Sequence, residues 1–168
     1  MIAKLLFLVF VTWLPFFELR ASIPLGILST KISLPFGLSF GAFGLSWGIV
    51  LPVVLLANIL IGPLVLFGLN KFVHHLLKVP IFSGVYGWSV LRTRAKVSKH
   101  VDRYGMLGMA IFIGLPLPGS GSYSGALGAH LLGMDFKKYI VANTFGVLIA
   151  GALVTLATLG ILQLPKIF

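Results

Sequence analysis

The apolar residues of the chain gather in four regions, and only two of these are long enough to form a membrane-crossing helix. A straight helix needs about 20 apolar residues to cross the hydrocarbon core of a bilayer. Residues 36–69 and 139–164 meet this length, although Pro52 and Pro63 lie within the first range. We predict one transmembrane helix in each of these two ranges.

The other two regions consist of short apolar limbs around residues that break helices. Residues 1–33 are interrupted at 15–20, and residues 104–134 are interrupted by the glycines and prolines of 114–122. Proline removes a backbone N–H and clashes with the preceding turn, and glycine is a poor helix former. Each limb has about half the length that a crossing needs. We therefore predict re-entrant helical hairpins at 1–33 and 104–134.

Basic residues decide the predicted topology. They concentrate in the segment 71–103, and Lys137 and Lys138 follow the second hairpin. Positive charge close to membrane segments favours the cytoplasmic side. Both flanks of the second hairpin then lie in the cytoplasm, and we predict short interfacial helices in 71–103 that bind anionic lipid. For residues 92–103 alone, a solvated basic loop explains the pattern almost as well.

The order of elements suggests an internal repeat. Each half of the chain has a hairpin followed by a crossing helix, and the crossing at 36–69 implies that the first hairpin enters from the opposite face. Transporters are often built from such inverted repeats. The predicted fold class is an all-α integral membrane protein with two inverted repeats, each a re-entrant helical hairpin followed by a transmembrane helix. The basic interfacial segment joins the two repeats in a single membrane domain of 168 residues.

Composition supports the membrane interpretation and excludes several classes of function. Hydrophobic residues make up 58% of the chain and charged residues 10%. That share of charged residues is too small to cover the surface of a soluble protein. The formal net charge is +10. The basic residues lie beside apolar spans, which indicates lipid rather than nucleic acid as the partner. The chain has no cysteine, no serine–histidine–aspartate arrangement and no carboxylate pair. We expect no enzyme activity, no cofactor and no metal.

The two breaks supply the candidate binding residues. Serine and proline are residues of the kind that begin helices, and a helix N-terminus inside the bilayer attracts anions. Glycines at the second break allow a ligand or another backbone to approach closely. We predict that the two tips meet near the midplane and together form an anion-friendly site. Its candidate residues are Glu18, Arg20, Ser22 and Pro24 at the first tip and Pro118, Gly119, Ser120, Gly121, Ser122 and Tyr123 at the second.

Glu18 and Arg20 admit two interpretations. On an extended stretch they would lie on the same side and pair as a structural salt bridge. Ionisable residues inside membrane segments more often serve a pathway or a ligand. In that case Arg20 binds an anionic head group and Glu18 is a proton-coupling carboxylate. Asn58 and Asn143, one in each long span, either pack or hydrogen-bond to broken backbone.

The motifs FELRASIPLG at 17–26 and GLPLPGSGSYSGA at 114–126 resemble the small multidrug export family. That family is similar to the DedA, or VTT-domain, membrane proteins, which have two opposed re-entrant hairpins and are linked to lipid movement, including polyprenyl phosphate carriers. The resemblance implies roles for Glu18, Arg20, Pro24 and the Pro118–Gly119 turn. The chain departs from DedA proteins at Gly119 and Gly121, where those proteins usually carry arginines.

These observations lead to three functional hypotheses. The first is a DedA-like transporter or flippase for an amphiphile with an anionic phosphate head group, with protons as the candidate coupling ion. The second is a proton-coupled exporter of cationic drugs that uses Glu18, and the third is a non-transporting membrane scaffold. We expect a multi-pass protein of the cell membrane, with membrane lipids and a small-molecule or lipid substrate as partners and a homo-oligomer as a possible assembly.

Overall fold

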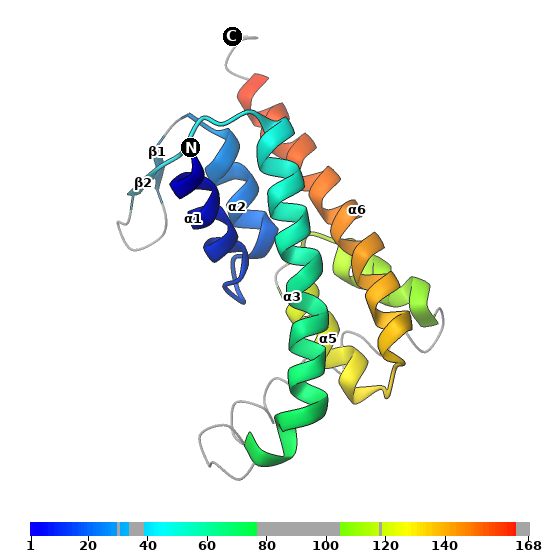
Figure 1. Ribbon diagram of the computed structural model, residues 1–168. Helices are drawn as coiled ribbons and strands as arrows, with labels where there is room; N and C mark the ends of the chain where they lie inside the picture. Colours follow the sequence, from blue (N-terminus) through cyan, green and yellow to red (C-terminus); the bar gives the residue numbers. More distant parts are fainter. Residues whose placement is uncertain (30, 34–38, 77–104, 118, 164–168) are drawn as a thin grey trace. The chain divides into compact units, whose positions relative to one another are not determined.

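The computed structural model describes residues 1–29, 31–33, 39–76, 105–117 and 119–163 (Figure 1). The chain divides into two compact units. The first unit contains residues 1–58 and 149–168, and the second contains residues 59–148. The predicted basic segment 71–103 lies largely outside the described residues, apart from its beginning in a helix that ends at Leu76.

The first unit begins with an antiparallel pair of short helices, α1 (Ile2–Thr12) and α2 (Glu18–Ile27) (Figure 1). The turn at 13–17 contains Pro15, so the chain breaks here as predicted, but the predicted break at 15–20 is wrong for residues 18–20, which begin α2. Two contacts define the register of the pair. The Leu8 side chain packs against Gly26, and the Thr12 and Ser22 hydroxyls are hydrogen-bonded at 2.8 Å. Both helices contribute buried apolar side chains to the core of this unit, among them Leu8, Leu19 and Ile23.

Two short strands follow, β1 (Lys31–Ser33) and β2 (Ser39–Gly41), and they pair antiparallel with Ile32 opposite Phe40. The sequence pattern does not indicate them, and the transmembrane helix predicted from residue 36 onward is wrong for residues 39–46. The physical reason is visible at Gly44, which has a φ of 62°, a left-handed conformation that a right-handed helix excludes. The long helix α3 therefore begins later, at Trp47.

The two long helices are α3 (Trp47–Leu76) and α6 (Phe136–Gln163). Within them, Trp47–Phe72 and Phe136–Gly160 are long and apolar enough to cross a membrane, judged by length and composition. This confirms the prediction of two long apolar helices. Helix α6 starts at Phe136 because the Asp135 carboxylate caps it, accepting hydrogen bonds from the backbone N–H groups of Lys137 (3.0 Å) and Lys138 (3.2 Å).

The second unit contains two more short helices, Gly105–Gly114 and α5 (Ser122–Leu131). The turn between them includes the glycine-rich break, as predicted. Ile113 packs against both Gly125 of α5 and Gly146 of α6, where added β-carbons would lie 2.7 Å and 2.6 Å from its side chain. Small residues therefore let these three helices approach closely, as is common in membrane proteins. The helical fold class is confirmed, whereas re-entrance and inverted repetition stay predictions.

The hydroxyl pair of Thr12 and Ser22 ties α1 to α2 inside the first unit. Both side chains are fully buried, and Ser22 also lies 3.0 Å from the Glu18 carbonyl oxygen of its own helix. We expect Ser22→Ala to destabilise the protein by about 1 kcal/mol, because an interhelical hydrogen bond is lost. Chemical unfolding in detergent micelles measures this.

The matched control for the Ser22 change is Thr158→Ala. The Thr158 hydroxyl is also buried, but it donates to Val154 within α6. Its removal should cost less, since no second helix is held by that bond. A cost equal to that of Ser22→Ala would contradict the interhelical role.

Candidate functional site

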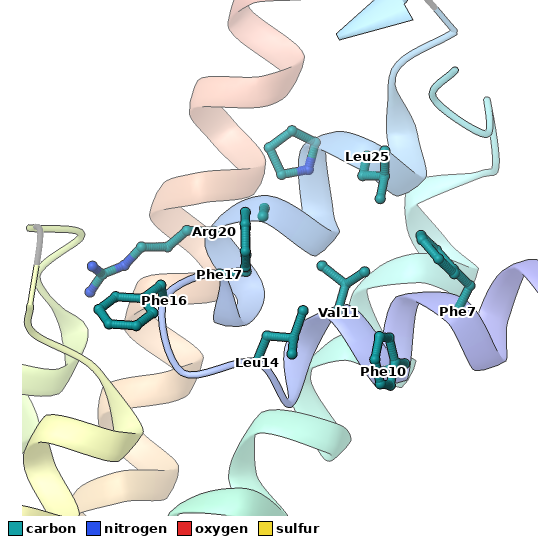
Figure 2. A pocket seen from close by; sticks show the side chains of 10 residues that line it. Phe7, Phe10, Val11, Leu14, Phe16, Phe17, Arg20 and Leu25 are labelled. Carbon is teal, nitrogen blue, oxygen red and sulfur yellow. The ribbon is translucent and has the colours of Figure 1, made fainter. Parts of the chain in front are cut away.

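A pocket of about 570 Å³ lies along α1 and α2 in the first unit (Figure 2). Its lining is apolar except for one arginine. Phe7, Phe10, Phe16 and Phe17 are exposed, and Phe16 retains 95% of its accessible surface, so the pocket is open to its surroundings. The lining residues are Phe7, Phe10, Val11, Leu14, Phe16, Phe17, Arg20, Ala21, Pro24 and Leu25.

The pocket is chemically polarised along its length. In Figure 2 the Arg20 side chain extends at one end, and Phe7 and Phe10 lie at the other end. Phe43 packs edge to face against Phe7 with ring centroids 5.8 Å apart. A guanidinium at one end of an apolar trough matches a molecule with an anionic head and an apolar body.

Glu18 does not share the pocket with Arg20. It is the first residue of α2 and only 5% exposed, and its φ of 44° is unusual for a residue other than glycine. Residues two apart in a helix lie about 200° apart around the axis. The stretch that holds Glu18 and Arg20 is therefore helical rather than extended, and their pairing as a salt bridge stays a prediction. Their charges still attract, because the Glu18 carboxylate favours the charged guanidinium.

Ser22 and Pro24 both lie inside α2 rather than at its start. The helix begins at Glu18, so the interpretation that Ser22 and Pro24 initiate it is wrong. Ser22 faces the core, where its hydroxyl bonds to Thr12. Pro24 lines the pocket, and its missing N–H leaves the Arg20 carbonyl without the usual helical donor. The regular hydrogen-bonding pattern of α2 is therefore interrupted at Arg20, the charged residue of the pocket lining.

The second set of candidate residues forms a tight turn in the second unit. Gly119 (φ 78°) and Gly121 (φ 135°) adopt conformations that favour glycine. The buried Ser120 hydroxyl lies 2.6 Å from the Leu115 carbonyl oxygen and 2.9 Å from that of Leu117, which closes the turn. Ser122 is the first residue of α5, as predicted, and Tyr123 is partly buried beside it. Pro118 lies outside the described residues.

Two residues of α6 donate hydrogen bonds to backbone carbonyls of the second unit, one at this turn and one in α3. Tyr139, which the sequence pattern did not indicate, is fully buried and donates to the Ser122 carbonyl at 2.7 Å. Asn143 donates to the Ile59 carbonyl at 3.1 Å. Ile59 lies four residues before Pro63, so this carbonyl has lost its usual helical partner. Asn143 thus hydrogen-bonds to a carbonyl of the long helix α3, whereas the sequence analysis considered it as a partner of the broken hairpin backbone, which stays a prediction.

The candidate residues thus form two groups, each within its own unit. Glu18, Arg20, Ser22 and Pro24 belong to α2, and Gly119–Tyr123 belong to the turn before α5 and its first residues. The meeting of the two tips stays a prediction. Among the described residues, no three His, Asp or Glu side chains gather in a way that could hold a metal ion.

The fold is helical, with two helices long and apolar enough to cross a membrane, and its first unit has an apolar pocket with an arginine at one end. Residues 18–153 match the family described as "Putative small multi-drug export protein". The match covers most of the 168 residues, and the chain belongs to this family. Searches of curated proteins and of solved structures found no match. The similarity to DedA proteins, the cell membrane as location and the number of crossings stay predictions.

Proposed function

We propose that this protein is a small membrane transporter that moves an amphiphile with an anionic head group, such as a phosphate lipid. The observation that carries the proposal is the position of Arg20 at one end of the apolar pocket along α1 and α2. Membership of an export family supports transport as the activity. A DedA-like flippase acting on a lipid carrier is the specific form of this proposal.

Arg20 would supply the selectivity of such a site. Lipid tails in the bilayer are as apolar as the pocket, so moving a hydrocarbon chain from lipid into the pocket gains little free energy. The head group differs, because a guanidinium can bind a phosphate through two parallel hydrogen bonds. The exposed aromatic side chains of the lining would admit the apolar body from the surrounding lipid.

Export of cationic drugs is the second candidate, favoured by the printed description of the family. It requires an acidic residue at the binding site. Glu18 is the acid of α2, but it is buried away from the pocket, and the charged residue in the lining is Arg20. A cation in this pocket would meet a like charge, which favours the anionic substrate.

Ligand binding by the purified protein tests the proposal. Two probes share one long alkyl chain and differ in the head group, which is a phosphate in one and a trimethylammonium in the other. We expect the phosphate probe to bind more tightly, and Arg20→Ala to weaken its binding at least tenfold. Arg20→Lys should fall between, since lysine keeps the charge but loses the bidentate geometry.

Lys4→Ala is the matched control, because it removes an equal charge from the same unit. The Lys4 ammonium lies 5.4 Å from the ring centroid of Phe43 and is not among the pocket residues. Its loss should leave phosphate binding within about twofold of the wild type. Tighter binding of the ammonium probe, strengthened further by Arg20→Ala, would overturn the proposal in favour of drug export.

A further inference from the structure

The residues that line the Arg20 pocket change in character along its length. At the end that holds Arg20, the neighbouring side chains are those of Phe16 and Phe17, in the turn between α1 and α2 (Figure 2). Aliphatic side chains, among them Leu14 and Val11, follow toward the other end of the pocket (Figure 2). The apolar atoms at the guanidinium end of the pocket are therefore aromatic.

The two rings beside Arg20 are available to a bound molecule. Phe16 is 95% exposed and Phe17 is 40% exposed, so neither ring is buried in the core. At the other end of the pocket, Phe7 already packs edge to face against Phe43. In the part of the chain that the structure describes, Phe16 and Phe17 pack against no other aromatic ring and no cation. Their faces and edges are thus open at the point where the pocket carries its charge.

Contact with lipid does not explain why these two positions hold phenylalanine rather than leucine. Lipid tails are as apolar as an aliphatic side chain, so an exposed ring gains little in a bilayer. A ring differs from leucine in its quadrupole, which has a negative face and a positive edge and favours edge-to-face or offset-stacked contacts with a second ring. A saturated chain offers no such partner. Phe16 and Phe17 therefore distinguish aromatic from saturated groups in a molecule whose charge is bound by Arg20.

We propose that the anionic group of the substrate is attached directly to an aromatic ring, so that the transported molecule is an aryl phosphate or a similar aryl anion. Arg20 binds the anion, and Phe16 and Phe17 hold the adjacent ring. The aliphatic part of the pocket accommodates apolar substituents of that ring. This inference rests on the proposed transport function and narrows its substrate class to amphiphiles whose charge adjoins an aromatic ring.

Two probes with the same head group and the same number of carbon atoms test the inference. They are para-octylphenyl phosphate and tetradecyl phosphate, and the binding of each to the purified protein is measured in lipid nanodiscs. We expect Phe16→Leu to weaken binding of the aryl phosphate about threefold, and the double change of Phe16→Leu and Phe17→Leu about tenfold. Binding of the alkyl phosphate should stay within about twofold of the wild type. Each probe is compared with itself across variants, so its partition into the bilayer cancels.

Phe145→Leu is the matched control, because it makes the same change at an exposed phenylalanine of α6 that is not among the pocket residues. It should leave the binding of both probes within about twofold. Phe16 is almost fully exposed, so its replacement removes little packing, and retained binding of the alkyl phosphate shows that a variant is folded. If the double variant does not fold, Phe16→Leu alone decides the test.

The outcomes separate this inference from the proposed function. Binding of the aryl phosphate that Phe16→Leu leaves unchanged, or equal weakening of both probes, would overturn the aromatic substrate class. The proposed function would still stand if Arg20→Ala weakens binding of the alkyl phosphate. If Arg20→Ala affects neither probe, the proposed function and the inference both fail.

Discussion

Replacing Asn143 with leucine is expected to destabilise the protein by about 2 kcal/mol, because it leaves a buried backbone carbonyl without a donor. Pro63 cannot donate to the Ile59 carbonyl, and Asn143 fills that role at 3.1 Å. Gly62 makes the approach possible, since an added β-carbon would lie 2.7 Å from the Asn143 amide oxygen. Leucine has a similar size but no N–H. Chemical unfolding followed by circular dichroism measures the loss.

The proline itself provides the control for this prediction. Pro63→Ala restores an N–H that can donate to Ile59 within α3, so the asparagine is no longer needed for that carbonyl. We expect Asn143→Leu to cost less than half as much in the Pro63→Ala background, and a double-mutant cycle isolates this coupling. An equal cost in both backgrounds would show that Asn143 contributes through packing alone.

The positions of the helices were largely predictable, because the length of the apolar stretches and the positions of helix-breaking residues largely determine where helices form. The long apolar stretches gave α3 and α6, and the breaks around Pro15 and at 114–122 separate the short helices. The errors lie at the ends of elements. The cap at Asp135 moves the start of α6 from residue 139 to Phe136, and the short strand pair moves the start of α3 to Trp47. Local capping and strand pairing are weak signals in a strongly apolar sequence.

The candidate site was predictable in its residue types and not in its geometry. Arg20 stood out because ionisable residues are rare in apolar segments. The apolar lining did not stand out, since phenylalanine and leucine occur throughout the chain. Placing Glu18 and Arg20 on one side assumed an extended backbone, whereas both residues lie in α2. The Asn58 amide has no hydrogen-bond partner among the described residues, and no sequence pattern indicates this, because it depends on helix packing.

Gly146→Val is expected to have the largest effect on stability, about 3 kcal/mol or more, because the added side chain has no space. A β-carbon at Gly146 would lie 2.6 Å from the β-carbon of Ile113 and 2.8 Å from the carbonyl oxygen of Ala110. Ile113 could change its rotamer but cannot move its β-carbon, and the carbonyl belongs to the backbone of the helix Gly105–Gly114. The two helices would have to separate. Unfolding in detergent, with Gly146→Ala as an intermediate step, measures the cost.

Gly68→Val is the matched control, since it makes the same change in a helix of the same unit. No atom lies within 4 Å of an added β-carbon at Gly68. Its effect should stay within about 0.5 kcal/mol and favour the folded state, because valine is a better helix former than glycine. Equal effects at Gly146 and Gly68 would mean that the helix Gly105–Gly114 does not pack closely on α6. A large difference would confirm that the absence of a side chain at Gly146 allows the helix before the glycine-rich turn to pack against α6, and this contact helps to hold the turn in place.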